Sequence, residues 1–255
     1  MFLTSDPITA AQNADNNLGA LAVTVSCNDI AAAGAEPVAV LLTMLLPPTT
    51  GAETAGIIVK QAEAAAKAVN VDIVGGHTEF TDAVIRPVVV ATAAGISDKI
   101  LSARGAKTGD AIIMTKYAGI EGTMILSNDY REKLALNDAE YQEAAGLINM
   151  LSVVPEGRLC AQIPEVTAMH DITEGGVLGA IDEICFSGNL GAEVYADKMP
   201  VLPLTDKICK KLSLDPYRLI SSGSMLITAR APEKVLKILA ENNISATAIG
   251  KVIDL

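Results

Sequence analysis

The stretch Met169-His170-Asp171-Ile172-Thr173-Glu174-Gly175-Gly176-Val177 has the form of a strand end, a polar turn, a glycine pair and the start of a helix. We expect Thr173 to cap a helix that begins near Glu174. A helix N-terminus beside two glycines suits phosphate, because free backbone N–H groups point towards the ligand. His170 and Asp171 add an imidazole and a carboxylate, which can transfer a proton or bind metal. The segment therefore predicts a strand–turn–helix connection with a candidate site at its turn.

Strand-like and helix-like stretches alternate on both sides of this segment. We expect strands at 2–9, 38–46, 71–74, 84–95, 111–115, 166–170, 191–196, 219–228 and 245–252. Helices are expected at 17–34, 52–69, 121–129, 138–151, 156–162, 174–187, 204–212 and 232–242. The polar stretch 96–110 has little apolar periodicity and separates the predicted domains 1–103 and 104–255. Strands mixed with helices in both halves predict layers of the α+β or α/β kind.

The charge balance limits the partners. The 255 residues include 19 Lys and Arg against 30 Asp and Glu, which gives a formal net charge of −11. Phosphates would be repelled, so we expect neither a nucleic-acid partner nor an anionic membrane surface. No Lys or Arg precedes Lys60, although Asp6 and Asp29 do. This predicts that another cation, such as a metal ion, balances those carboxylates.

The apolar runs and the cysteines indicate in which cellular compartment we expect the protein. The longest apolar run, 38–46, is about half of the ~20 residues that a membrane helix needs, and the N-terminus lacks the features of a signal peptide. The four cysteines show no CxxC pattern and no His at zinc-ligand spacing. We interpret them as reduced thiols in the core of a cytoplasmic protein.

Two segments of the first half are candidate sites with open alternatives. Asp29 follows Leu18, Ala22 and Val25 at helical spacing, so its carboxylate is expected on the core-facing side and should have a metal or several donors as partners. The alternative is an Asp that caps the following turn. Gly75-Gly76-His77-Thr78-Glu79 is expected directly after a buried strand, where paired glycines can form an anion-binding concavity. The alternative there is a glycine-rich turn with polar side chains.

Two segments of the second half are weaker. Residues 116–123 form another expected strand-to-helix turn, and 218–224 are interpreted as a bulged or bent strand. The P-loop, GxGxxG and GxSxG patterns are absent from the sequence. Nucleotide phosphates would therefore need a less common cradle, in which metal bridges them to carboxylates.

Taken in order, these segments resemble the AIR synthase-related family, the PurM superfamily, which includes aminoimidazole ribonucleotide synthetase, the hydrogenase maturation protein HypE, thiamine-monophosphate kinase and selenophosphate synthetase. The matching landmarks are Thr4-Ser5-Asp6-Pro7, Asn28-Asp29-Ile30-Ala31, Gly34-Ala35-Glu36-Pro37, Gly75-Gly76-His77-Thr78-Glu79, Gly119-Ile120-Glu121-Gly122-Thr123, His170-Asp171-Ile172-Thr173-Glu174-Gly175-Gly176, Leu219-Ile220-Ser221-Ser222-Gly223 and Ile249-Gly250-Lys251-Val252. They span essentially the whole chain, and the chain is most similar to HypE-like members.

The resemblance implies an α+β protein of two domains. An N-terminal sheet domain would form a β-barrel with that of a second subunit, and a C-terminal α/β sandwich would follow. It also implies a homodimer with ATP in the cleft near the dimer interface, Mg²⁺, and ATP-dependent phosphorylation of an amide or similar oxygen. The substrate would be a small molecule or a protein-bound carbamoyl or amide group, as in hydrogenase maturation.

The resemblance also implies roles for individual residues. Metal binding falls to Asp6 and Asp29, to His77, which stands where many relatives have a metal-ligating Asp, and to Glu79 as a possible substitute. His170 and Asp171 are the expected catalytic pair. Nucleotide and phosphate binding is expected of Asn28, Gly75, Gly76, Thr78, Gly119, Gly122, Thr123, Thr173, Glu174, Gly175 and Gly176.

The chain departs from the family pattern at both ends. Relatives begin with a glycine- and acid-rich stretch that contacts nucleotide and metal, and HypE ends in a cysteine that receives the carbamoyl group. This chain begins close to Asp6, and its last cysteine is Cys209. We therefore expect HypE-like chemistry without that acceptor cysteine. The alternatives are a non-catalytic, shortened homologue that acts as a dimeric maturation or accessory protein, and a small-molecule kinase similar to thiamine-monophosphate kinase.

Overall fold

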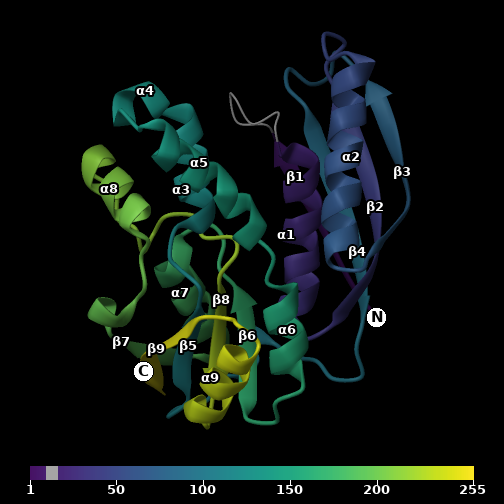
Figure 1. The fold of residues 1–255 in the computed structure, drawn as a ribbon. Coiled ribbons are helices and arrows are strands. Elements are labelled where there is room, and N and C mark those ends of the chain that lie inside the picture. Colours follow the sequence, from purple (N-terminus) through teal and green to yellow (C-terminus); the bar gives the residue numbers. More distant parts are fainter. Residues whose placement is uncertain (10–16) are drawn as a thin grey trace. The chain divides into compact units, whose positions relative to one another are not determined.

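The computed structural model describes residues 1–9 and 17–255, which divide into two compact units. The N-terminal unit contains residues 1–30 and 36–97, and the C-terminal unit contains 31–35 and 98–255 (Figure 1). The structure therefore changes from one unit to the other a few residues before the sequence-based boundary at 103. Within the described residues no helix is long and apolar enough to cross a membrane.

The N-terminal unit is one mixed sheet with two helices. Its elements are β1 (Phe2–Thr9), α1 (Leu18–Ala32), β2 (Glu36–Leu46), α2 (Ala52–Ala68), β3 (Asp72–Phe80) and β4 (Val88–Ile96). Among the described residues the strands are ordered β1-β4-β2-β3, with β2 and β3 parallel and the other two pairs antiparallel. The edges of this open sheet are thus β1 and β3.

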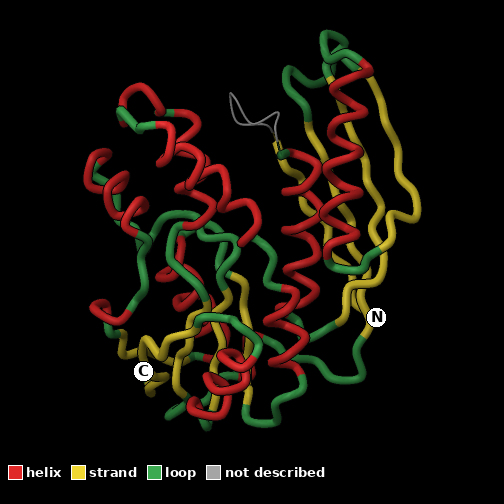
Figure 2. Tube along the Cα trace, in the orientation of Figure 1, coloured by secondary structure: helices red, strands yellow, loops and turns green. Residues whose placement is uncertain are grey.

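One face of this sheet carries the core and the other is uncovered. Burial alternates along β1 and β4, and Ala91 on β4 is fully buried where Ser26 of α1 donates a hydrogen bond to its carbonyl. Figure 2 shows α1 and α2 running along the sheet. On the opposite face Leu3, Leu41 and Ile96 are 65%, 47% and 58% exposed. The alternating pattern of a half-buried sheet leaves apolar side chains on a face that no described segment of this unit covers.

The C-terminal unit is an antiparallel sheet between two helical layers. Its strands are β5 (Ala111–Thr115), β6 (Val166–Asp171), β7 (Leu190–Val194), β8 (Met225–Ala229) and β9 (Ala246–Asp254), ordered β6-β8-β5-β9-β7. Its helices are α3 (Ile120–Asp129), α4 (Arg131–Leu134), α5 (Asp138–Gly146), α6 (Val154–Ala161), α7 (Gly176–Gly188), α8 (Pro203–Leu212) and α9 (Pro232–Glu241), with short 3-10 turns at Ala103–Gly105, Leu147–Met150 and Ala196–Lys198.

Alternate residues of the same strand belong to different cores. Met114 packs in a cluster with residues of α7, whereas Ile113 packs in a second cluster with Val235 and Leu239 of α9. Both faces of the sheet are therefore covered. This confirms the α+β fold expected from the sequence, although a closed barrel is not formed by the described part of a single chain.

Three expectations about elements were wrong. The strand expected at 71–74 runs on to Phe80 as the exposed edge strand β3. The strand expected at 219–228 covers only 225–229, because the hydroxyls of Ser221 and Ser224 pair with backbone groups of residues 117 and 119 instead of continuing the sheet. The helix expected at 174–187 begins at Gly176, and its N-cap is Gly175 with no side-chain capping bond, so Thr173 does not cap it.

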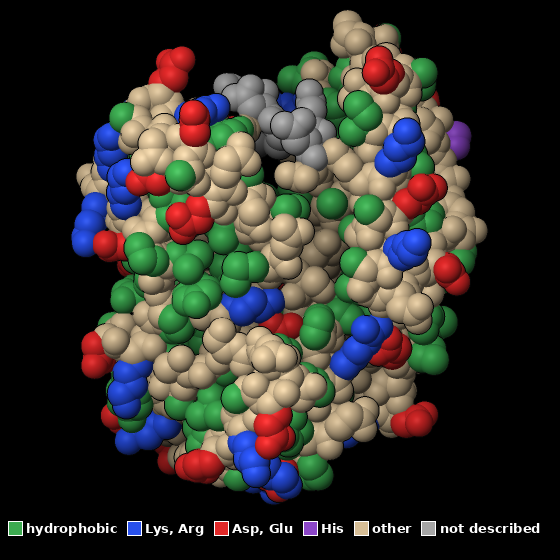
Figure 3. All heavy atoms as spheres, in the orientation of Figure 1, with side chains coloured by type: hydrophobic (Ala, Val, Ile, Leu, Met, Phe, Trp, Pro, Cys, Tyr) green, Lys and Arg blue, Asp and Glu red, His purple; other side chains and the backbone are tan. Residues whose placement is uncertain are grey.

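Charged side chains of both signs lie on the surface. On the face drawn in Figure 3, Lys and Arg side chains lie interspersed with Asp and Glu. Ion pairs such as Lys234–Glu165 (2.7 Å) and Lys251–Glu193 (2.8 Å) account for part of this pattern.

Candidate functional site

Asp6 and Asp29, two of the three carboxylates expected to bind metal, meet at one hydroxyl group. Thr4 Oγ1 donates to Asp29 Oδ2 at 2.6 Å and lies 3.4 Å from Asp6 Oδ2. Ser26 Oγ is also 3.4 Å from Asp6 Oδ2. Asn28, expected to bind nucleotide, is buried on the same helix, α1. The sequence places Asp6 on β1 and Asp29 on α1, and the packing of α1 on the sheet brings them together.

His77 and Glu79 form a separate pair on the edge strand β3. Their side chains are 68% and 54% exposed, and His77 Nε2 lies 3.9 Å from Glu79 Oε2. Strands β4 and β2 separate β3 from β1, so one chain does not bring these two side chains to Asp6. Within the described residues no group of three or more His, Cys, Asp or Glu is placed to hold a metal ion.

The glycine pair beside His77 lies inside strand β3, and not after the strand as expected or in a glycine-rich turn as the alternative had it. Gly75, Gly76 and Thr78 pair with Leu41, Leu42 and Met44 of β2. Gly76 has φ +152°, and a Cβ atom there would lie 1.9 Å from the carbonyl oxygen of Leu42. Close approach of two strands therefore explains this glycine without a ligand. Binding of phosphate by Gly75, Gly76 and Thr78 stays a prediction.

The turn between β6 and α7 is held from several sides by backbone bonds. Ile172 N donates to Ser224 O, and both Gly176 N and Ser221 N donate to Thr173 O. Gly176 has φ +63°, and a Cβ there would lie 2.5 Å from Tyr217 O. The glycine is thus needed for packing. Thr173 is half-buried in the turn, whereas Glu174 and Gly175 are exposed.

His170 is held between two oxygen atoms. Its Nδ1 lies 2.6 Å from Asp171 O, and its Nε2 lies 2.7 Å from Oε2 of Glu183 on α7. Asp171 Oδ1 is 3.8 Å from Nδ1. We had not identified Glu183 from the sequence. It follows Gly176 by seven residues, two helical turns along the same face, and that spacing is the signal that could have found it.

The first turn of α3 uses its donors inside the protein. Gly119 N donates to Ser221 Oγ at 2.7 Å, and Gly122 N donates to Ile220 O at 3.0 Å. Thr123 Oγ1 donates to Gly119 O at 2.6 Å. These groups hold the segment 219–224 against α3, and their role as phosphate ligands stays a prediction.

Glu121, also missed from the sequence, joins three segments. Burial raises the pKa of its carboxyl, hydrogen bonds from Ser222 oppose that rise, and the charge of Glu174 adds to it. Glu121 is 8% exposed, and its Oε2 has no hydrogen-bond partner among the described residues. The start of α3, the β6–α7 turn and the segment 219–224 therefore meet around a buried carboxyl group.

A buried ion pair lies after β5. Lys116 Nζ is 2.8 Å from Glu156 Oε1 of α6 and donates to the carbonyls of Met150 and Ser152. Burial lowers the pKa of Lys116, and Glu156 opposes that shift. The pair ties the end of β5 to the segment before α6.

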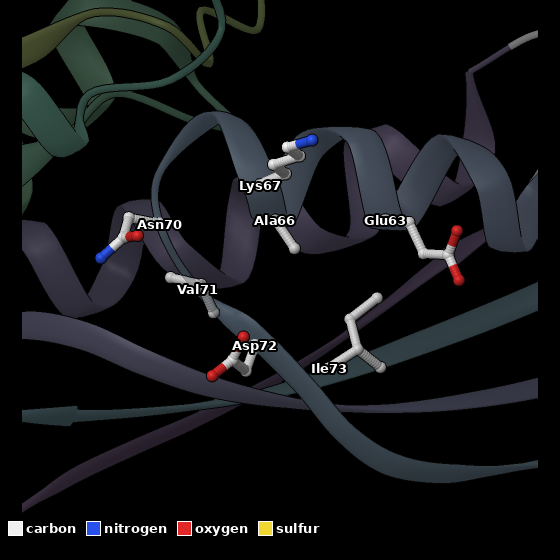
Figure 4. Close-up of a pocket in the computed structure, with 7 residues that line it drawn as sticks. All are labelled: Glu63, Ala66, Lys67, Asn70, Val71, Asp72 and Ile73. Carbon is white, nitrogen blue, oxygen red and sulfur yellow. The ribbon is translucent and has the colours of Figure 1, made fainter.

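A pocket of about 350 Å³ lies apart from these residues, at the end of α2 and the start of β3. Figure 4 shows Glu63, Lys67, Asn70 and Asp72 among its lining side chains. None of the site residues expected from the sequence lines it.

Comparison with known proteins identifies the family. Residues 2–97 match the model of the AIR synthase related protein N-terminal domain, and residues 107–255 match that of its C-terminal domain. The chain belongs to the AIR synthase related family. The resemblance seen in the sequence is thereby confirmed over nearly the whole chain.

The relatives of this chain include proteins named for hydrogenase maturation. It is 29% identical over 236 residues to a putative hydrogenase expression/formation protein of Methanocaldococcus jannaschii, which covers 91% of this chain and 68% of the relative. It is 28% identical over 221 residues to carbamoyl dehydratase HypE of Cupriavidus necator, and the match covers 85% of this chain and 61% of the relative. The chain thus spans about two thirds of the length of these relatives.

Solved structures agree. The structure of Escherichia coli HypE matches with a TM-score of 0.87 at 25% identity, over 99% of this chain and 79% of the other. Thiamine monophosphate kinase of Aquifex aeolicus matches with a TM-score of 0.80 at 18% identity. The match covers 99% of this chain and 85% of the other, which shows a shared fold.

Proposed function

We propose that the chain is an ATP- and Mg²⁺-dependent, HypE-like enzyme that activates an amide or carbonyl oxygen by phosphorylation. The observation that carries the proposal is the meeting of Asp6 and Asp29 at the Thr4 hydroxyl. A HypE protein of the same fold has been solved in complex with ATP, and relatives of this chain are named carbamoyl dehydratases.

The donor set at Asp6 and Asp29 fits magnesium. Mg²⁺ prefers oxygen ligands and is commonly held by one or two carboxylates together with substrate phosphates. Two carboxylates and the hydroxyls of Thr4 and Ser26 provide such oxygens. When bound, the ion would offset the negative charge of the phosphates, which this acidic chain would otherwise repel.

Residues of each unit have a proposed role of their own. Asp6 and Asp29 would hold the metal–nucleotide, and Thr4 would fix the orientation of the Asp29 carboxylate. Asp171, which is mostly buried at the end of β6, would position the acceptor or accept its proton. The acceptor belongs to the class of small-molecule or protein-bound carbamoyl and amide groups. One HypE structure is a complex with HypF, which motivates testing a protein-bound acceptor.

Calorimetric titration of ATP with and without Mg²⁺ tests nucleotide binding. We expect the wild-type chain to bind ATP in the presence of Mg²⁺, and Asp29→Asn to weaken that binding at least about tenfold, because a ligand carboxylate is lost. Asp72→Asn is the matched control, since Asp72 is an exposed carboxylate elsewhere in the same unit. Failure of the wild type to bind ATP would reject the proposal.

We also propose that the chain is a homodimer through the uncovered face of the N-terminal sheet. Exposed Leu3, Leu41 and Ile96 on that face, together with two sheet edges that no described strand pairs with, support a second copy as its partner. Sedimentation velocity should give a dimer for the wild type and a monomer for Leu41→Lys. A wild-type monomer would reject the dimer and leave the proposal on ATP standing.

A further inference from the structure

One oxygen of the Glu121 carboxyl group is enclosed by the protein without a hydrogen-bond partner. Glu121 is 8% exposed, and its Oε2 makes no hydrogen bond within the part of the chain that the structure describes. Hydrogen bonds from Ser222 are therefore assigned to the other oxygen, Oε1. Glu156, the other buried glutamate among the described residues, instead faces Lys116 at 2.8 Å. A buried acceptor without a partner is destabilising, so Oε2 is a candidate for contact with a ligand.

The backbone donors beside this carboxyl group are used within the protein. Gly119 N and Gly122 N, at the start of α3, donate to the segment 219–224 at 2.7 Å and 3.0 Å. Gly176 N, at the start of α7, donates to Thr173 O at 3.1 Å. A phosphate at a helix N-terminus is held by N–H groups that point freely towards it. These bonds leave fewer such donors for a phosphate, whereas the carboxyl group between the two helix starts offers an acceptor.

The charge at this junction also disfavours an anion. Glu174, in the turn between β6 and α7, acts on Glu121 as a like charge. A phosphate or carboxylate brought to these two side chains would be repelled, whereas an N–H donor would gain a charge-assisted hydrogen bond from Oε2. Glu174 and Gly175 are exposed, so the junction borders solvent on the side of this turn.

We propose that Glu121 is a specificity-determining residue that accepts a hydrogen bond from an N–H group of the acceptor, and that it thereby selects a primary amide or carbamoyl group against a phosphate ester or a carboxylate. This role rests on the proposed function, which supplies the reaction. An amide NH₂ group has two N–H donors and no negative charge. Glu121 would hold the nitrogen end of the acceptor group and leave its oxygen free for phosphorylation.

Saturation-transfer NMR titrations with acetamide and acetate test this selection in the full chain, without nucleotide. The two probes have nearly the same shape, but one presents an NH₂ group where the other presents an anionic oxygen. We expect the wild type to bind acetamide at least about tenfold more tightly than acetate, because a hydrogen bond to a charged acceptor is gained with one probe and a like charge is met with the other.

Glu121→Gln should reverse this preference. Donors of Ser222 hold an oxygen at the position of Oε1, so the glutamine NH₂ group would occupy the position of Oε2 and present a donor there. Acetamide should then bind about tenfold more weakly than to the wild type, and acetate should bind more tightly. Glu143→Gln, the matched change at an exposed glutamate, should leave both affinities unchanged.

Two results would overturn the proposal. One is a wild-type chain that fails to bind acetamide or binds acetate as tightly. The other is an unchanged preference in Glu121→Gln while its urea midpoint shows a folded chain. Calorimetric titration of ATP with Mg²⁺ separates this failure from that of the proposed function. A chain that binds ATP and fails the probe titrations loses the role of Glu121 alone, whereas a chain that does not bind ATP loses the proposed function itself.

Discussion

At the scale of single residues, Glu121 stands out because its carboxyl group is buried and one of its oxygens has no partner in the part of the chain that the structure describes. Its pKa is raised by burial, and the charge of Glu174 adds to that rise against the hydrogen bonds from Ser222. The folded chain therefore holds a proton on Glu121 at pH values where the unfolded chain has released it. Stability must then fall as pH rises above the ordinary value of 4.5, through the window up to the folded pKa.

We predict that Glu121→Gln removes this loss of folding stability at higher pH. The urea midpoint of the variant should exceed that of the wild type by an amount that grows as pH rises from 4 to 8, because the glutamine does not ionise. Glu143→Gln, a change at an exposed glutamate, should show no such trend. Parallel midpoints for wild type and Glu121→Gln across this pH range would contradict the prediction.

Single residues also show what the sequence could and could not predict. Helical spacing placed Asp29 beside the core and required a partner, and Thr4 supplies one at 2.6 Å. Glu156 and Glu121 gave no comparable signal, because their partners Lys116 and Ser222 come from distant segments. Such pairs are set by tertiary packing, which local periodicity does not report.

At the scale of elements, β3 shows how a local pattern misleads. The glycine pair indicated a turn, since glycines commonly end strands. Pairing with β2 instead continues through Gly75 and Gly76, with a register shift between Val40 and Leu41. On an edge strand this irregularity is tolerated, because only one side of the strand must match a neighbour.

Gly75 and Gly76 should therefore differ sharply on substitution. Gly76→Ala should destabilise the protein by about 1–3 kcal/mol, since its φ of +152° is strained for a side chain and the Cβ would meet Leu42 O at 1.9 Å. Gly75→Ala should cost less, because its Cβ would meet only the flexible end of Leu41 at 3.3 Å. Equal losses in urea unfolding would show that the strand geometry at 76 is not the cause.

The connection from β5 to α6 depends on one ion pair. Lys116→Met should destabilise the chain by about 3–5 kcal/mol, because it leaves Glu156, whose side chain is 2% exposed, buried without a counter-charge. The double variant Lys116→Met with Glu156→Gln should regain part of that stability. Lys210→Met, which removes an exposed pair with Asp206, should cost about 0.5 kcal/mol or less in the same urea titration.

At the scale of the whole molecule, the two-part α+β organisation could be predicted because alternating strands and helices and family landmarks run through the entire chain. Strand order could not be read from the sequence. The separation of His77 and Glu79 from Asp6 follows from that order, with β1 and β3 at opposite edges. The metal-ligand set expected from the sequence is thus divided by topology.

The four cysteines, which are buried and form no disulfide among the described residues, report on the opening of both units. Burial, with Glu156 adding, raises the pKa of Cys160 to about 12, and burial with nearby aspartates raises that of Cys209 to about 11. Thiolates are the reactive form, so a disulfide reagent at pH 8 should label none of the four quickly in the folded chain and all four in urea. Rapid labelling of a folded chain would contradict this. In partial denaturant, Cys27 reports on the N-terminal unit and the other three report on the C-terminal unit.

The apolar face of the N-terminal sheet has a consequence for abundance. In the homodimer that we propose, a second copy covering Leu3, Leu41 and Ile96 would bind folded chains and not unfolded ones, so mass action would tie folding to the amount of protein present. In a cell that makes little of this chain, a larger fraction would remain monomeric with its sheet uncovered, open to proteases and to aggregation at its edges. The level of expression would then contribute to keeping the chain folded.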